Sequence, residues 1–364
     1  MLKLAYIGGL GMMAGPGAFH LTPADVARVV RYHDRGRPGE ARERFRQAWR
    51  KHGAAPVRDL EALVGDGDLD GVVLCAGKNG DDLPIVTELA RRLSRFRERN
   101  PFILHLSTVS PTFAERAVPF CAGHGVRYAN YPLTGGPQGA ALGGADPRGM
   151  LILAAGERSL YEQLLPLLER LGQPRYFGAV PGAGAVTKLI SHHLVFNGLT
   201  GVCAAVALHS EAFNDSVPGG AAQHDYLAFL NGGAGGTRQW ELSMSRGVGE
   251  GVWDAGFAVR HAMVDAIYAA QLALDLGLPR MLVQPMIHTA IAFSHLLMRR
   301  PDQALATHAV ALETLASEAD ALDAFMQGMG AFDQSPRQQI ANAIASFPEA
   351  VRELVRIDPR FDTD

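Results

Sequence analysis

Short apolar runs alternate with amphipathic stretches through the first 180 residues of the chain. Apolar runs bounded by glycine or charged residues predict buried strands, here at residues 2–7, 28–33, 70–75, 102–106, 126–129 and 150–154. Helical spacing of apolar residues predicts helices at residues 40–52 and 160–171. Strands that alternate with helices are typical of an α/β fold with a doubly wound parallel sheet.

The pattern changes after about residue 182, where long helical periods replace the strand signals. These periods cover residues 185–213, 257–276, 281–298, 302–326 and 336–357. We therefore expect three parts: an α/β domain at residues 1–181, an interdomain helix at 182–213, and an all-α C-terminal domain at 214–364.

A glycine-rich segment directly follows the first predicted strand. Gly9, Gly11 and Ala14 match the spacing GxGxxG/A of dinucleotide-binding loops. The first glycine permits a tight turn, the second lets the backbone approach a pyrophosphate, and a helix N-terminus then offers N–H groups to the phosphates. The residues Gly15-Pro16-Gly17 should shorten or delay that helix. The candidate cofactor-binding residues of this loop are Gly9, Leu10, Gly11, Met12 and Met13.

An acidic residue stands at the end of the second predicted strand, where such domains bind the ribose diol. Asp34 lies 25 residues after Gly9 and would repel a 2′-phosphate, which favours NAD. The neighbouring Arg35 and Arg37 can accommodate that phosphate and favour NADP. We expect NAD or NADP as the cofactor, with NAD slightly favoured.

Composition and charge exclude several classes of protein. With 48% apolar residues, 20% charged residues and a net charge of −3, the chain is typical of a folded protein that does not bind nucleic acid. Its three cysteines lack CxxC spacing, so we expect neither a disulfide framework nor a metal site. The N-terminus lacks the pattern of a signal peptide, and the longest apolar run, residues 194–208, is short for a membrane span and suits a buried helix. A cytoplasmic protein without membrane contacts is expected.

Three further segments follow the glycine loop in a fixed order: HLSTVSP at residues 105–111, PLTGG at 132–136 and GAGAVTKLISH at 182–192. Together with the loop, they resemble the β-hydroxyacid dehydrogenase family, whose segments are GLGxMG, DxSTxxP, xPVSGG and GxGxxxKxxxN. The resemblance covers roughly residues 3–300. It implies an N-terminal Rossmann domain, an interdomain helix, an all-helical domain, NAD(P)-dependent hydride transfer on a small hydroxy acid or its oxo form, and a homodimer or homotetramer.

The resemblance also implies where the substrate and the nicotinamide lie. The substrate carboxylate is expected at Ser107, Thr108, Thr134, Gly135 and Gly136. Paired glycines let backbone N–H groups reach an anion, and small hydroxyls add further donors. The nicotinamide is expected near Cys75, Ala76, Gly77 and Thr108.

Lys188 is the candidate proton relay. Of 34 basic residues only four are lysines, and Lys188 alone is charged between Arg175 and Glu211. A buried lysine gives up its proton readily, whereas arginine cannot. A lysine that extends from the helix end to solvent is the alternative. The resemblance implies that Lys188 is the general acid/base on the substrate hydroxyl.

The chain departs from the family pattern at several positions. His192 replaces the asparagine four residues after the lysine and can share the helix face of Lys188, so we expect it to be catalytic or to bind the substrate. The adjacent His193 is expected to be structural. The remaining departures are His105 for the aspartate of DxST, Thr134 for a serine, and Val264 for a lysine before the retained Asp265. These departures predict a substrate that differs from the common ones.

About 60 residues after position 300 have no counterpart in shorter family members. They predict added helices that serve subunit packing or closure over the substrate. Two other functions stay open. One is an imine reductase-like enzyme, in which another residue usually occupies the lysine position. The other is a nucleotide-binding protein that has lost catalysis, an alternative that His192 and Val264 keep open.

Overall fold

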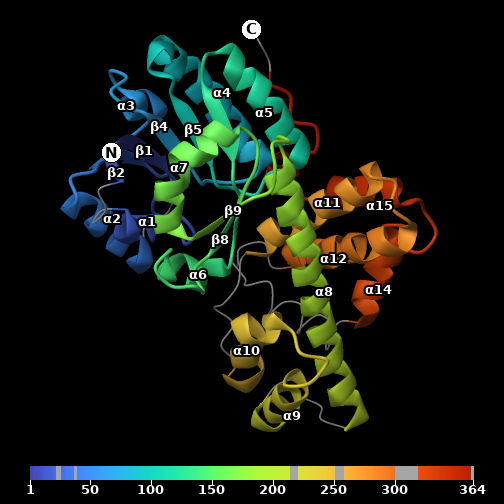
Figure 1. Cartoon of the computed structure of the whole chain (residues 1–364). Coiled ribbons are helices and arrows are strands. Elements are labelled where there is room, and N and C mark those ends of the chain that lie inside the picture. Colours follow the sequence, from blue (N-terminus) through green and yellow to red (C-terminus); the bar gives the residue numbers. More distant parts are fainter. Residues whose placement is uncertain (22–25, 37–38, 214–219, 251–257, 300–318, 362–364) are drawn as a thin grey trace. The chain divides into compact units, whose positions relative to one another are not determined.

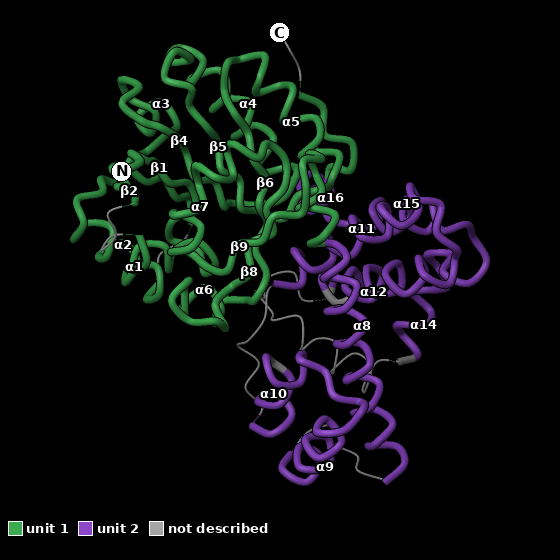
Figure 2. The backbone as a smooth tube through the Cα atoms, viewed as in Figure 1, with its two compact units in different colours: residues 1–188, 356–364 green, residues 189–355 purple. Residues whose placement is uncertain are grey.

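The computed structural model describes residues 1–364 except 22–25, 37–38, 214–219, 251–257, 300–318 and 362–364. The chain forms two compact units (Figure 2). Unit 1 comprises residues 1–188 and 356–364, and unit 2 comprises residues 189–355.

A six-stranded parallel sheet forms the centre of unit 1, in the order β3-β2-β1-β4-β5-β6. The strands are β1 (Leu2–Ile7), β2 (Ala27–His33), β3 (Ala55–Pro56), β4 (Gly71–Leu74), β5 (Phe102–His105) and β6 (Arg127–Asn130). This order is the one found in dinucleotide-binding domains. The chain adds β2 and β3 on one side of β1 and then adds β4, β5 and β6 on the other side, so the strand order reverses between β1 and β4. The predicted doubly wound fold is confirmed, and five of the six strands lie where the apolar runs placed them.

Helices cover both faces of this sheet because successive strand residues point to opposite sides (Figure 1). On one face, Leu4 and Tyr6 of β1 share a core with α1 (Gly17–His20), α2 (Glu40–Lys51) and α7 (Arg158–Leu171). On the other face, Ala5 and Ile7 share a core with three other helices. Those helices are α3 (Leu60–Val64), α4 (Asn79–Leu93) and α5 (Pro111–Gly123), and a 3₁₀ turn at Ser94–Arg99 follows α4.

A second, three-stranded sheet in unit 1 contains β7 (Leu133–Thr134), β8 (Leu151–Ala154) and β9 (Gln173–Tyr176). Strand β7 is antiparallel to β8, and β9 is parallel to it. The strand expected at residues 150–154 therefore exists, but it belongs to this smaller sheet. Helix α6 (Gly136–Leu142) connects β7 to β8.

Unit 2 is helical, as predicted. Its elements are most of α8 (Ala183–Ala212), α9 (Ala221–Asn231), a π-helical turn at Trp240–Met244, α10 (Ser245–Glu250), α11 (Val259–Asp275), α12 (Arg280–Arg299), α14 (Ala319–Gly328), α15 (Pro336–Ser346) and α16 (Glu349–Val355). The single helix expected at residues 336–357 is wrong. Phe347 precedes a proline and takes an extended ψ of 148°, which separates α15 from α16. The expected helix at 302–326 lies outside the described residues up to position 318.

Helix α8 is long and apolar enough to cross a membrane by length and composition alone. It has 30 residues, and its most apolar 18-residue window has a mean hydropathy of 1.4. The run at residues 194–208, expected to be too short for a span, is therefore part of a helix that is long enough for one. Only 39% of that window is buried, so the expected burial holds in part. A core helix of a globular protein passes the same test, and one such helix is weak evidence for a membrane.

Candidate functional site

The loops that follow β1 and β4 touch at the carboxyl edge of the parallel sheet. Gly8 has a φ of +79°, and a Cβ at that position would lie 2.0 Å from the carbonyl oxygen of Cys75. Only glycine allows this left-handed turn and this close approach of two backbones. The tight turn expected at Gly9 is therefore at Gly8, one residue earlier.

The segment after Gly8 is a series of turns rather than a regular helix. Gly11 N–H donates to the carbonyl of Gly8 at 2.9 Å, and the next regular helix, α1, begins only at Gly17. The expected delay of the first helix is confirmed, but no regular helix N-terminus follows Gly11 directly. Among the described residues, the backbone N–H groups of Met12 and Met13 donate to no protein acceptor. These turn N–H groups fit the phosphates of a dinucleotide.

Trp49 of α2 forms a hydrogen bond with the backbone of the glycine loop, a contact that the sequence did not predict. Its indole Nε1–H donates to the carbonyl of Gly9 at 2.7 Å, and the side chain is fully buried. A Cβ on Gly9 would lie 3.1 Å from the same nitrogen. The available signal was a tryptophan on the apolar face of the helix predicted at residues 40–52.

Asp34 lies directly after β2, and its carboxylate holds the glycine loop. It accepts hydrogen bonds from Leu10 N–H at 3.1 Å and from Gly36 N–H at 2.7 Å, and Arg42 Nη1 forms an ion pair with it at 2.6 Å. Asp34 lies beside the loop, as its interval from Gly9 predicts. Because Arg42 neutralises the carboxylate, Asp34 does not present a bare negative charge. Arg35 is exposed beside it, and Arg37 lies outside the described residues.

The ends of β4 and β5 are joined through Ser107. Its Oγ accepts a hydrogen bond from Ala76 N–H at 3.1 Å, and among the described residues its own O–H has no acceptor, so it can donate to a ligand. Asn130, the last residue of β6, donates its side-chain N–H to the carbonyl of Ser107 at 3.1 Å.

Burial and the nearby Asp82 raise the pKa of the Cys75 thiol to about 12, so Cys75 stays protonated and is no nucleophile. Thr108 is half-buried next to Ser107.

The predicted Thr134-Gly135-Gly136 segment forms the end of β7 and the start of α6. Both glycines have positive φ, +129° and +66°, so this turn depends on glycine at both positions. The described contacts do not connect these three residues to Ser107 or to the glycine loop. Their role in carboxylate binding stays a prediction.

Lys188 lies one turn into α8, and its side chain is only 7% exposed. Gly184 packs the start of this helix against the sheets, because a Cβ there would lie 2.4 Å from the carbonyl oxygen of Leu153 and 3.1 Å from that of Asn130. These two residues lie at the carboxyl ends of β8 and β6. The lysine is therefore buried near the sheet edge and does not extend freely into solvent.

His192 and Asp265 form a buried pair within unit 2. The distance from His192 Nδ1 to Asp265 Oδ2 is 3.4 Å, and both side chains are at most 4% exposed. His192 follows Lys188 by four residues on α8, so the two share a helix face. Burial lowers the pKa of His193, and a hydrogen bond with the backbone of Ala269 offsets this only partly. His193 is thus neutral at physiological pH, which agrees with a structural role.

A parallel sheet of this strand order, with a glycine loop at the point where its order reverses, defines a dinucleotide-binding protein. Residues 3–184, half of the chain, match the family described as the NAD binding domain of 6-phosphogluconate dehydrogenase. An uncharacterized oxidoreductase of Synechocystis sp. is 24% identical over 284 residues, which cover 78% of this chain and 90% of that relative.

Two solved structures share the fold. The 3-hydroxyisobutyrate dehydrogenase of Salmonella typhimurium has a TM-score of 0.67 at 18% identity, covering 85% of this chain and 99% of that chain. The Mycobacterium tuberculosis 3-hydroxyisobutyrate dehydrogenase, solved with L-serine, has a TM-score of 0.62 at 20% identity, covering 87% of this chain and all of that one. The chain belongs to the 6-phosphogluconate dehydrogenase-like family of β-hydroxyacid dehydrogenases that its motifs predicted. It is an NAD(P)-dependent oxidoreductase.

Proposed function

We propose that this protein transfers a hydride between a nicotinamide cofactor and a small hydroxy acid or its oxo form. The observation that carries the proposal is the burial of Lys188, one turn into a helix that Gly184 packs against the carboxyl ends of β6 and β8. A buried amine is costly unless its proton is used or paired, and it can both accept and donate that proton.

The chain's own residues divide the work as follows. The O–H of Ser107, with Thr108, Thr134 and the N–H groups of Gly135 and Gly136, binds the substrate carboxylate. The bound nicotinamide supplies or accepts the hydride at the carbinol carbon. In the oxidation direction, the neutral amine of Lys188 takes the proton of the hydroxyl as the C=O bond forms. In the reduction direction, the ammonium of Lys188 returns that proton to the oxygen.

We propose a further role for His192, which Asp265 holds in place on the helix face of Lys188. Its imidazole offers a donor or an acceptor where the family pattern has an asparagine. The 3-hydroxyisobutyrate dehydrogenases named above act on a 3-hydroxy acid, and one was solved with L-serine. Because His192 and Val264 differ from the family pattern, we propose a related hydroxy acid with a different substituent on the carbon chain.

The test is an absorbance screen at the NADH band. The purified protein is offered 2- and 3-hydroxy acids and sugar acids with NAD or NADP, and imines with NADPH. Turnover of a hydroxy acid supports the proposal. Turnover of imines alone refutes it in favour of an imine reductase. Turnover of none of the compounds, together with dinucleotide binding, refutes it in favour of a nucleotide-binding protein without this activity.

We propose NAD as the cofactor, with the phosphates at Gly9, Leu10, Gly11, Met12 and Met13. The adenosine ribose lies at Asp34 beside Arg35, and the nicotinamide at Cys75, Ala76, Gly77 and Thr108. The hydrogen bond from Leu10 N–H to Asp34 supports this arrangement, since the ribose-binding acid of dinucleotide-binding domains lies beside the glycine loop.

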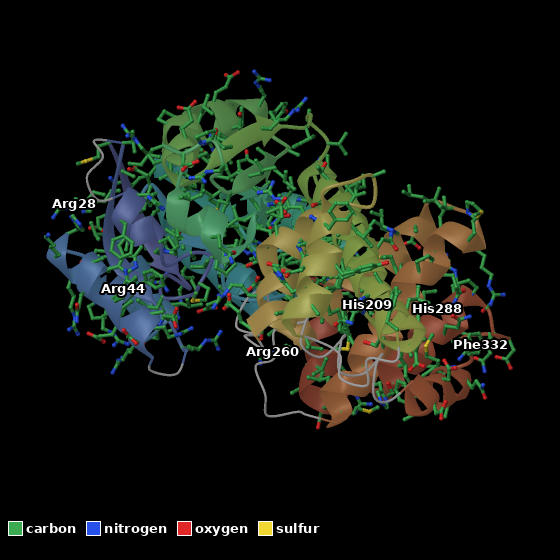
Figure 3. The ribbon with its side chains drawn as sticks, turned by 90° about the horizontal axis from the view of Figure 1, so that it is seen from below. Arg28, Arg44, His209, Arg260, His288 and Phe332 are labelled. Atoms are coloured by element: carbon green, nitrogen blue, oxygen red, sulfur yellow. The ribbon has the colours of Figure 1, made fainter. Side chains whose placement is uncertain are left out.

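Replacing Asp34 with alanine should weaken NAD binding by about tenfold, the cost of a hydrogen bond to a charged group. NADP should lose less affinity, because the substitution releases Arg42 from its ion pair and lets it meet a 2′-phosphate. Fluorescence titration with NADH and NADPH measures both dissociation constants. Arg44 is exposed on the same helix (Figure 3), and Arg44→Ala is the control that should change neither. Equal losses for both dinucleotides in the Asp34→Ala protein would contradict the ribose assignment.

We propose that the protein is a homodimer, or a homotetramer built from such dimers, and that α8 forms the interface. Exposed positions follow one another along α8 at intervals of three and four residues, at Ile190, Leu194, Asn197, Gly201, Ala204 and Leu208. Leu194 and Leu208 stand seven residues on either side of Gly201. The stripe is therefore self-complementary in an antiparallel pair, with small residues where two copies of α8 cross and large ones on both sides.

The double substitution of Leu194 and Leu208 by glutamate should convert the assembly to monomers, because four charges would be buried in the pair. Light scattering after size exclusion gives the mass. Leu276→Glu introduces the same charge at an exposed leucine elsewhere in unit 2 and should leave the mass unchanged. A monomeric wild-type protein, or one that requires detergent, would refute the dimer and leave another chain or lipid as the occupant of this face.

We further propose that the enzyme is cytoplasmic. Residues 1–181 serve as its NAD(P)-binding domain, residues 182–213 as the interdomain helix and residues 214–364 as the helical domain. The segment after about residue 300 then serves subunit packing or closure over the substrate.

A further inference from the structure

His105 ends β5 at the position where the family pattern has an aspartate, and its ring is fully buried. Both ring nitrogens have partners. Nε2 lies 2.9 Å from Oδ2 of Asp82, and Nδ1 lies 2.7 Å from the hydroxyl of Tyr128. Nothing in the proposed hydride transfer uses these three buried polar groups.

The chemistry of its partner decides the role of Nε2. A carboxylate oxygen can only accept a hydrogen bond, so Nε2 carries a hydrogen and donates it to Oδ2 of Asp82. Burial raises the pKa of Tyr128 well above its ordinary value, so its hydroxyl keeps its proton while it forms the hydrogen bond with Nδ1. The histidine thus supplies Asp82 with a hydrogen-bond donor inside the core.

Asp82 connects this core to the loop after β4. It lies in the first turn of α4, is fully buried, and its Oδ2 also accepts the backbone N–H of Gly77 at 3.3 Å. Its other oxygen, Oδ1, has no hydrogen-bond partner among the described residues. A buried carboxylate with so few partners is costly, so the contact with His105 is needed to keep Asp82 directed at Gly77.

Two successive N–H groups of the Cys75-Ala76-Gly77 loop are therefore fixed, one by the segment that follows β5 and the other by α4. Ala76 N–H is held by Ser107, and Gly77 N–H is held by Asp82. An aspartate at position 105 would place a second carboxylate against Asp82, and like charges in a buried site repel strongly. A histidine at position 105 is therefore compatible with the buried Asp82, whereas an aspartate there is not.

We propose that His105 is a positioning residue for the nicotinamide loop: through Asp82 it holds Gly77 and so fixes the backbone of residues 75–77 where the cofactor ring packs. The inference rests on the proposed function for the identity of that ligand. The link from His105 through Asp82 to Gly77 is contained in unit 1 and does not depend on it.

Two substitutions of similar shape distinguish the role of Nε2 of His105 from the role of Nδ1. His105→Gln keeps an N–H donor near the position of Nε2, whereas His105→Asn keeps a polar group only near Nδ1. We expect the Gln variant to bind NADH with nearly wild-type affinity and the Asn variant to bind it about tenfold more weakly. Tyr128→Phe removes the other hydrogen bond of the same ring, and it should lower the melting temperature without changing the NADH dissociation constant.

Amide exchange measured by NMR or mass spectrometry, without cofactor, tests the link directly. The N–H of Gly77 should exchange faster in His105→Asn and in Asp82→Asn, and at the wild-type rate in Tyr128→Phe. Unchanged exchange at Gly77 in the His105→Asn protein overturns the proposal, as does an equal loss of NADH affinity in His105→Asn and Tyr128→Phe. A wild-type protein that binds neither NADH nor NADPH refutes the proposed function instead, and the Gly77 exchange then still decides on the His105–Asp82 link.

Discussion

Replacing Lys188 with alanine is expected to lower kcat by about 10²–10⁴-fold, the usual contribution of a positioned general acid/base. The affinity for the cofactor should stay unchanged, because the contacts that support dinucleotide binding come from the loops after β1, β2 and β4. Steady-state kinetics with the hydroxy acid found in the screen gives kcat, and fluorescence titration gives the cofactor dissociation constant. A loss confined to kcat identifies Lys188 with the chemical step.

Lys188→Arg distinguishes a proton relay from a mere positive charge. Arginine keeps the charge but cannot give up a proton in a protein, so this variant should be as inactive as the alanine variant. Lys51→Ala removes an exposed lysine at the end of α2 and should leave turnover unchanged. Turnover by Lys188→Arg within tenfold of wild type would refute the proton-relay role and leave a purely electrostatic one.

The parallel sheet was predictable from the sequence because its strands are buried on both faces. The buried part of a strand that helices cover on both sides must be apolar, and this is why β4, β5 and the last four residues of β1 are short apolar runs, whereas Lys3 lies in the half-buried start of β1. Helices α4 and α5 gave no comparable signal. Each contains an internal proline, Pro84 or Pro119, and such residues usually indicate the end of a helix rather than its interior.

The candidate site was predictable only where its residues are close in sequence or fall at a fixed spacing. The glycine motif led to the correct loop, and the interval from Gly9 led to Asp34, which contacts that loop through Leu10. The turn itself fell at Gly8, because the close approach to Cys75 is set by the spacing of two strands that are remote in sequence. Trp49 and the His105–Asp82 pair were missed for the same reason. Their contacts depend on how helices pack against the sheet, which residue spacing does not encode.

Gly8→Ala should destabilise unit 1 more than any other single methyl group added near the proposed cofactor site. The left-handed backbone at φ +79° costs a residue with a side chain roughly 1–2 kcal/mol. The new Cβ would lie 2.0 Å from the Cys75 carbonyl oxygen, and relieving this overlap costs about 1–3 kcal/mol more. The free energy of unfolding should therefore fall by about 2–5 kcal/mol, and NAD(P) affinity should fall by at least about tenfold as the loop is displaced.

Gly123→Ala is the matched control for this experiment. Gly123 is the exposed last residue of α5, has no positive φ, and an added Cβ would meet no atom within 4 Å. Since alanine favours helices over glycine, this variant should keep or slightly raise the melting temperature and bind cofactor as wild type does. Thermal melts with and without NADH compare the two variants. If Gly8→Ala matches Gly123→Ala in both melting temperature and NADH binding, the loops after β1 and β4 do not meet as closely as described, and the assignment of the glycine loop to the cofactor loses its structural basis.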